Sequence, residues 1–210
     1  QSNLAQNLCA VVVGGQSNRA GNSHAFVGGG LSNRAMQLWS VVVGGNNNLS
    51  QNFYAFIGGG ENNIADDRAA VVCGANNQAL GFHSFVGAGS NCVVTASGAA
   101  GVIGGGGSNT VTSHGGFIGS GQNNSVGGSF ASITSGGQNI SDGDYAAIIG
   151  GHELTLSATA DRSFGYHAGG PGFALPLTIN TPNTGFFGNV DLWIGSNDNI
   201  AHELRFYELN

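Results

Sequence analysis

The sequence has no lysine, one methionine and only three prolines, and charged residues make up 8% of its 210 residues. The five basic residues are all arginines, and they are scattered along the chain. With a formal net charge of −6 and no basic cluster, we expect no nucleic-acid partner. No apolar run approaches the ~18 residues that span a bilayer, so we expect no direct membrane insertion.

Cysteine is equally sparse. Cys9, Cys73 and Cys92 are an odd number and lack the spacing of metal ligands, so the sequence predicts neither a disulfide framework nor a metal site. Cys73 replaces a valine or isoleucine in an apolar segment, and we expect it to be a small core residue.

Glycine, in contrast, is abundant, with 39 residues. It recurs in one unit, seen as Ala25–Asn33 (AFVGGGLSN) and again as Ala55–Asn63 (AFIGGGENN). A sister unit of valines followed by glycine begins at Val11 and again at Val41. Self-similarity at a short fixed period is typical of a repeat architecture.

We count the period from the residue that closes each apolar segment. These closing residues are Gly14, Gly28, Gly44, Gly58, Gly74, Gly87, Gly104, Gly119, Ser135, Gly150 and Gly165. The mean interval is about 15 residues, and the first four intervals alternate between 14 and 16. Each apolar segment is short and rich in β-branched residues, which indicates a strand rather than a helix.

A polar corner follows each of these strands. Glycine accepts unusual backbone angles, and asparagine tolerates the left-handed region and bonds to nearby backbone. The corner asparagines are Asn18, Asn33, Asn48, Asn63, Asn91, Asn109, Asn124 and Asn139. A small or apolar residue lies two positions later and marks a second strand. One repeat is therefore strand, corner, strand and return corner, which is one coil of an all-β parallel solenoid.

The first strand of each coil is apolar on both faces. The residue before each closing residue should point into the coil, so the residue before that points outward. The outward set is Val12, Phe26, Val42, Phe56, Val72, Phe85, Val102, Phe117, Ile133 and Ile148. The thin core of one coil covers only the inward face, so we expect symmetric copies to cover the outward one. A 30-residue coil with separate valine and phenylalanine rows is the alternative.

The units Phe-Val/Ile-Gly-Gly-Gly-x-x-Asn-x-Ala resemble the head repeats of trimeric autotransporter adhesins of the YadA-like group. The resemblance covers roughly residues 8 to 169. It implies a left-handed parallel β-roll with one 15-residue repeat per coil, in an extracellular homotrimer whose axis is lined by the outward set. It also favours the 15-residue coil over the 30-residue one. We predict that the repeat domain covers residues 1–169.

Residues 170–210 differ in composition. All three prolines lie at 171, 176 and 182, so we expect the solenoid to stop there and a small β cap to follow. Alternating patterns at 190–194 and 202–209 predict two strands. The segment Glu203–Glu208 resembles tail-fibre proteins of phage type, upstream of an endosialidase-type chaperone. That resemblance implies a chain that stops before the chaperone or has lost it.

The clearest candidates for ligand binding are aromatic residues five positions before the closing residue. They are Trp39, Phe53, Phe82, Phe130 and Tyr145. They could contact a glycan or a host protein, or they could be buried between coils or subunits. The six histidines are dispersed, and no acid pair or nucleophile–base grouping recurs, so we expect no catalytic residues and no cofactor.

These observations favour a non-enzymatic, trimeric attachment fibre that binds a cell-surface protein or glycan. The tail segment favours the receptor-binding fibre of a phage or phage-like contractile injection system. The repeats favour a bacterial adhesin head instead. A passive spacer and a β-helix enzyme that degrades polysaccharides are the remaining alternatives, and the enzyme would need clustered carboxylates on one face.

Overall fold

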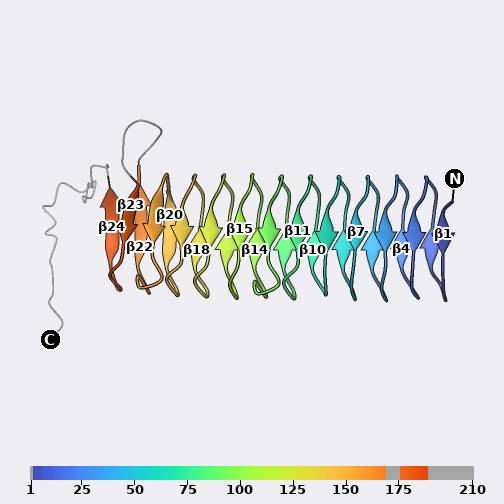
Figure 1. The fold of residues 1–210 in the computed structure, drawn as a ribbon, viewed down its shortest axis with the longest axis horizontal. Coiled ribbons are helices and arrows are strands. Elements are labelled where there is room, and N and C mark those ends of the chain that lie inside the picture. The colour runs from blue at the N-terminus through green and yellow to red at the C-terminus, as the bar shows by residue number, and fades with distance from the viewer. Residues whose placement is uncertain (1, 169–175, 189–210) are drawn as a thin grey trace, which may run out of the picture.

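The chain is described by a computed structural model that covers residues 2–168 and 176–188. The described residues form a straight rod of stacked coils, with the N-terminal coil at one end (Figure 1). All regular elements in this part are strands, and none of these residues forms a helix that could cross a membrane.

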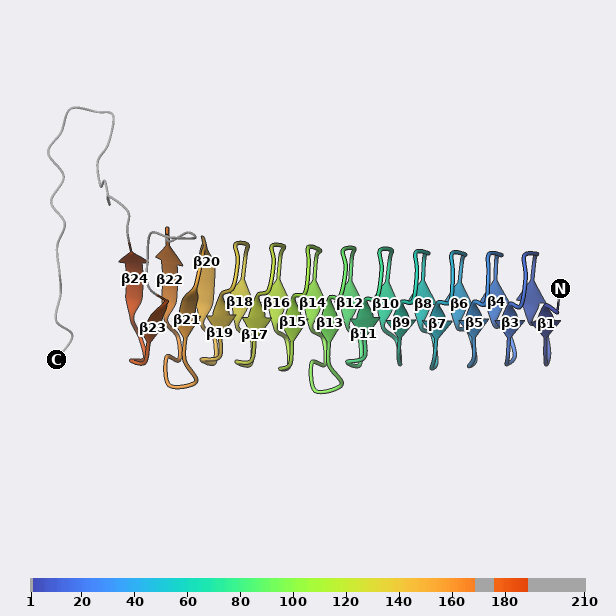
Figure 2. The same ribbon diagram turned by 45° about the horizontal axis from the view of Figure 1, so that its top comes forward.

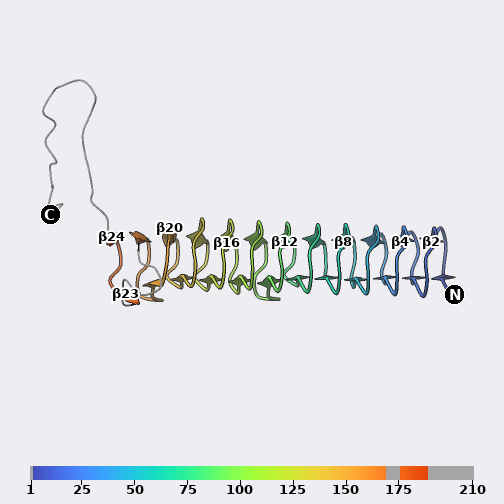
Figure 3. The same ribbon diagram turned by 90° about the horizontal axis from the view of Figure 1, so that it is seen from above.

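The strands lie in two parallel sheets of twelve strands each. Odd-numbered strands form sheet A and even-numbered strands form sheet B, so that each coil contributes one strand to each layer (Figure 3). Sheet A contains β1 (Leu4–Ala5), β3 (Arg19–Ala20), β5 (Arg34–Ala35), β7 (Leu49–Ser50), β9 (Ile64–Ala65), β11 (Gln78–Ala79), β13 (Val93–Val94), β15 (Thr110–Val111), β17 (Ser125–Val126), β19 (Ile140–Ser141), β21 (Leu154–Leu156) and β23 (Leu177–Ile179). Sheet B contains β2 (Val11–Val12), β4 (Phe26–Val27), β6 (Val41–Val42), β8 (Phe56–Ile57), β10 (Ala70–Val71), β12 (Phe85–Val86), β14 (Val102–Ile103), β16 (Phe117–Ile118), β18 (Ser132–Ile133), β20 (Ala147–Gly151), β22 (Phe164–His167) and β24 (Gly185–Gly188).

Successive strands of one sheet pair in parallel, mostly at a spacing of 15 residues, with exceptions such as 14 between Phe56 and Ala70 and 17 between Phe85 and Val102. Leu4 pairs with Arg19 in sheet A, and Val11 pairs with Phe26 in sheet B. Valine and phenylalanine rungs therefore alternate within one ladder. The 15-residue coil is confirmed, and the 30-residue alternative is wrong.

The core is a single file of inward side chains from each sheet. Val27, Val42 and Ile57 of sheet B are completely buried, and so are Ala20 and Ala35 of sheet A. Val94 and Val111 of sheet A face a glycine in the corner that leads to sheet B, where other coils have alanine or serine. A Cβ on Gly101 would lie only 2.8 Å from Cγ1 of Val94.

Two corners close each coil. We call the corner that follows the sheet B strand the Gly corner, and it is a turn with two left-handed residues. In the second coil these are Gly30 (φ +89°) and Ser32 (φ 56°). A Cβ on Gly30 would overlap the carbonyl oxygen of Gly45 in the next coil. Glycine is therefore required at this position by both backbone angle and contact between coils.

Buried asparagines join the Gly corners into a ladder. Asn48 donates from Nδ2 to the carbonyl oxygens of Gly44 (3.0 Å) and Gly60 (2.8 Å). Its Oδ1 accepts the backbone N–H of Asn63 at 3.0 Å. Most buried asparagines of the ladder thus pair backbone groups of their own coil and the next, which buried polar backbone requires.

The ladder differs from prediction in the middle of the rod. Asn77, which the sequence analysis omitted, holds a ladder position, whereas the predicted Asn91 is exposed. Cys92 takes the next position, and its N–H donates to Oδ1 of Asn77 at 3.0 Å. The inward residue of that strand is consequently Val94, not Val93.

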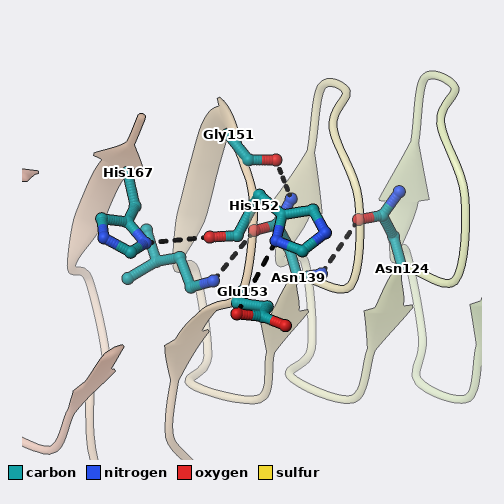
Figure 4. A network of polar contacts seen from close by, with 7 residues as sticks. Asn124, Asn139, Gly151, His152, Glu153 and His167 are labelled. Atoms are coloured by element: carbon teal, nitrogen blue, oxygen red, sulfur yellow. Dashed lines mark hydrogen bonds and ion pairs between the residues drawn. The ribbon is translucent and has the colours of Figure 1, made fainter. Parts of the chain in front are cut away.

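The C-terminal end of the ladder is a polar network around His167 (Figure 4). Oδ1 of Asn139 accepts the N–H of Leu154 at 3.0 Å, and Leu154 then replaces asparagine. Beyond it, His167 is 4% exposed, and its Nδ1 lies 2.8 Å from the carbonyl oxygen of His152. Nδ1 of His152 lies 3.8 Å from Oε2 of Glu153.

The prolines do not end the sheets. β23 pairs with β21 and β24 pairs with β22, so the solenoid extends past residue 169 to residue 188. Pro176 directly precedes β23 and Pro182 lies in the following corner, where no ladder N–H is needed. The strands predicted at 190–194 and 202–209, and the segment Glu203–Glu208, lie outside the described residues.

Candidate binding surfaces

Sheet B presents an apolar outer face along most of the rod. Alternate residues of each strand point outward, which gives two rows of side chains. The first row is Val11, Phe26, Val41, Phe56, Ala70, Phe85, Val102, Phe117, Ser132, Ala147 and Phe164. The second row is Val13, Gly28, Val43, Gly58, Val72, Gly87, Gly104, Gly119, Thr134 and Ile149. We call these two rows the apolar face.

Side-chain sizes in the two rows compensate one another. The coils with Phe26, Phe56, Phe85 and Phe117 in the first row have glycine in the second, and two other coils have valine in both. Cε1 of Phe26 would lie 3.3 Å from a Cβ on Gly28, so the ring leans over the glycine. The same arrangement recurs at Phe56 and Gly58. One phenylalanine therefore fills about the same width as two valines, which keeps the face level.

The prediction of outward residues was correct for only part of the set. Phe26, Phe56, Phe85, Val102 and Phe117 lie in the first row, and Val72 lies in the second. Val42, Ile133 and Ile148 are completely buried in the core of the coil, and half-buried Val12 packs against the core. These four residues were wrongly assigned to an inter-subunit face.

The error arose from using glycine to align the segments. A Val-Val-Val segment has two outward residues, whereas a Phe-Val-Gly segment ends one position earlier, so alternate coils were shifted by one residue. A shift of one exchanges the faces of a strand. Val13, Val43, Thr134 and Ile149, which were predicted to point inward, are exposed for this reason. Cys73, predicted to be in the core, is also exposed, because it follows the second-row residue Val72 and belongs to the Gly corner.

The corner between sheet A and sheet B, the return corner, carries exposed aromatic residues. Figure 2 shows it along the lower edge, where the loops after β13 and β21 project furthest. One residue per coil there is left-handed. The row is Cys9, His24, Trp39, Tyr54, Arg68, His83, Ala100, Gly115, Phe130, Tyr145, Arg162 and Asn183. Phe53 and Phe82 immediately precede members of this row. We call the aromatic members and these two residues the aromatic ridge.

The left-handed conformation is costly for bulky residues. It costs roughly 1–2 kcal/mol for a residue other than glycine. At the Gly corner the same conformation is held by Ser17, Asn47, Asn62 and similar small polar residues. The return corner instead holds Trp39 at φ 62° and Tyr145 at φ 57°. The backbone does not require rings here, so contacts of the rings themselves explain their presence.

Some of the contacts made by these rings join neighbouring coils. The rings of His24 and Trp39 stack at 4.0 Å with an angle of 12° between their planes. The Arg68 guanidinium lies between two rings, 5.5 Å from the centroid of Tyr54 and 5.1 Å from that of Phe82. Such stacked and cation–π pairs stabilise adjacent coils.

A second group of rings lies further along the same corner. Phe130 and Tyr145 stack at 5.5 Å, and His114 meets Phe130 edge-on at 5.1 Å. A Cβ on Gly115 would lie 2.7 Å from Cδ1 of Phe130, so this glycine makes room for the ring. All five predicted aromatic residues thus lie at one corner. Tyr54 belongs with them and was missed.

The ridge offers a ligand ring edges and partly exposed ring surfaces. Trp39 is 48% exposed, and Tyr145 is 58% exposed. Within the described residues, no three His, Cys, Asp or Glu side chains are placed to share a metal ion.

The sequence matches no known family model, and no curated protein is significantly similar to it. The fold and the two surfaces are therefore the basis for considering function.

Proposed function

We propose that this chain is a segment of a homotrimeric, non-enzymatic fibre that attaches its parent particle or cell to a cell-surface protein or glycan. The observation that carries the proposal is the apolar face. Phe56, Phe85 and Phe117 are 37%, 38% and 42% exposed on it, and the face continues over successive coils. A long, continuous apolar surface of this kind is typical of a protein–protein interface.

A second copy of the same chain fits this face best. Copies share one rung spacing, so their rows stay matched along the rod, whereas an unrelated partner would lose register. The face is only two rows wide, which allows three copies to meet around one axis. Phenylalanine levels and valine levels would then alternate along that axis.

Assembly through the apolar face of sheet B leaves the return corner and sheet A exposed to solvent. The return corner with the aromatic ridge would be repeated three times on a rigid rod. Several weak contacts made at once raise avidity without a strong single contact, which suits attachment in an extracellular setting. Trp39, Phe53, Phe82, Phe130 and Tyr145, with Tyr54, are the proposed contact residues.

Two versions of the fibre are open. The receptor-binding fibre of a phage or phage-like injection system rests on the resemblance at Glu203–Glu208, and the bacterial adhesin head rests on the repeats. The residues that follow this segment in the natural protein would distinguish the two versions. A chaperone domain supports the first version, whereas heptad repeats and a membrane anchor support the second.

Native mass by light scattering tests the assembly, and a printed glycan array with whole-cell binding tests the attachment. A trimer that binds through the ridge is the expected result. A trimer that binds nothing would instead indicate a passive spacer. Turnover of a polysaccharide by the purified chain would contradict the non-enzymatic proposal.

A further inference from the structure

A hollow of about 210 Å³ lies on the outer side of sheet A next to the Gly corner. It is lined by Arg34 of β5, Leu49 of β7, Ile64 of β9 and the corner residues Asn47, Asn48 and Asn62. Drug-sized pockets are usually ~300 Å³ or larger, so this hollow suits one small residue of a longer ligand. Sheet A forms the layer opposite sheet B (Figure 3), so assembly through the apolar face leaves the hollow open.

Among the described residues, none is a partner for the cation in the hollow, the guanidinium of Arg34. Arg19, one coil earlier, donates from Nη2 and Nε to Oε1 of Gln6 at 2.9 and 3.2 Å. The position that corresponds to Gln6 in the next coil is Gly21, which has no side chain. No described residue consequently bonds or pairs with the Arg34 guanidinium.

Arg34 also stands beside a like charge. Arg19 and Arg34 are direct partners in the register of β3 and β5, and like charges at such positions are destabilising. Two of the five basic residues of a chain with formal charge −6 thus lie side by side. An anion bound at Arg34 would relieve this repulsion. A guanidinium binds a carboxylate through two parallel hydrogen bonds.

The rest of the lining suits a sugar. Asn47 donates from Nδ2 to Oδ1 of Asn62 at 2.8 Å, which leaves Oδ1 of Asn47 and Nδ2 of Asn62 available to a ligand. One accepts and the other donates, as hydroxyl groups require. Leu49 and Ile64 are half-buried apolar side chains in the same lining. The hollow therefore combines a cation, two amide groups and an apolar surface.

We propose that this hollow binds a carboxylate-bearing sugar residue of an acidic polysaccharide, with Arg34 on the carboxylate and Asn47 and Asn62 on hydroxyl groups. The inference gives the proposed attachment function a ligand class and rests on it for its biological meaning. Binding itself is a property of the single chain and can be measured whatever its oligomeric state.

Calorimetric titration of the full chain with trigalacturonate tests the proposal, with the neutral trimer of galactose as the comparison. We expect saturable binding of the acidic probe and at least tenfold weaker binding of the neutral one. Arg34→Gln should lower the affinity at least tenfold. Arg19→Gln is the matched control and should change it less than threefold, because Arg19 bonds to Gln6 and does not line the hollow. Equal losses in both variants would overturn the proposal.

A second variant fills the gap instead of removing the cation. A Cβ on Gly21 would lie 3.5 Å from its nearest neighbours, which is ordinary contact, so Gly21→Gln should fold. The new side chain should reach Arg34 as Gln6 reaches Arg19 and weaken trigalacturonate binding. Unchanged affinity in this folded variant would overturn the proposal.

Two other probes define the ligand class. Acetate or a tetraglutamate peptide that binds as tightly as trigalacturonate would show that the hollow reads only a carboxylate or an acidic peptide, against the proposal. A monomer that binds trigalacturonate through Arg34 would contradict the fibre but retain this site. A trimer that binds no acidic sugar would support the fibre but contradict this site.

Discussion

The backbone N–H of Asn63 donates to Oδ1 of Asn48 at 3.0 Å, and the two side chains occupy the same position in successive coils. Both are completely buried. The bond joins two coils at the Gly corner, directly before the sheet A bond from the N–H of Leu49 to the carbonyl of Asn63. Removal of the Asn48 side chain therefore leaves two backbone groups unpaired, the N–H of Asn63 and the carbonyl of Gly44.

Asn48→Ala should destabilise the rod by about 2–4 kcal/mol, because the N–H of Asn63 and the carbonyl of Gly44 lose their partner, and the carbonyl of Gly60 keeps only the N–H of Asn46. Asn46→Ala in the same corner removes only an exposed bond to Glu61 and should cost less than about 0.5 kcal/mol. Chemical denaturation of both variants measures the difference. Equal costs would contradict the structural role of the ladder.

Adjacent glycines in one corner should differ sharply. Gly60 has φ +93°, and a Cβ there would overlap the carbonyl oxygen of Gly74, whereas a Cβ on Gly59 would meet no atom within 4 Å. We expect Gly60→Ala to cost about 2–4 kcal/mol and Gly59→Ala to be nearly neutral. Thermal unfolding of the pair is the measurement, and a tolerated Gly60→Ala would contradict the requirement for glycine at this position.

Asp142 should make stability depend on pH. Burial raises the pKa of Asp142 above its ordinary value. The folded state then holds this proton to a higher pH than the unfolded chain does. The resulting stabilisation is present at low pH and is lost as the pH rises through the folded-state pKa.

The uncharged variant Asp142→Asn should therefore have a higher Tm than the wild type at neutral pH. The gap should shrink as the pH falls toward the ordinary Asp value of 3.8. Thermal melts at several pH values check this. A gap that stays constant or widens on acidification would be inconsistent with a desolvated carboxylate at this position.

The aromatic ridge can be tested without loss of the fold. Asparagine already holds the left-handed conformation at the Gly corner, so Trp39→Asn should keep the backbone and change the stability by no more than about 1 kcal/mol. Binding to cells or glycans should fall at least tenfold if the ridge is the contact surface. Undiminished binding by a folded Trp39→Asn would remove the ridge from the proposed function.

The solenoid and its corners were predictable because glycine and asparagine are needed for particular backbone angles, and those needs repeat with each coil. The facing of the strands was only partly predictable. Valine serves equally well inside and outside a thin coil, so Val12 and Val42 give no sign of their direction. Pairing Val11 with Phe26 would have resolved it, and the 14–16 alternation of the intervals was the available signal.

Changes in coil length were harder to detect. The return corner at Asp66–Ala69 is one residue shorter than its neighbours, and the corner at Thr95–Gly101 is two residues longer. Neither change involves the glycines used for counting. Asn91 was placed in the ladder for another reason: Cys92 stands at the ladder position of that corner, and Asn91 is the asparagine next to it. The Arg34 hollow could not be predicted, because it depends on residues from three coils and on the missing side chain of Gly21.

The native mass of the wild type, of Phe56→Glu and of Phe53→Glu tests the central claim most directly. Phe56 and Phe53 are almost equally exposed, at 37% and 39%, but only Phe56 lies on the apolar face. We predict about three times 21.0 kDa for the wild type and for Phe53→Glu, and a smaller species for Phe56→Glu. A wild type of twice the chain mass would retain the face as an interface but contradict the trimer. A monomeric wild type would contradict the account of the apolar face altogether.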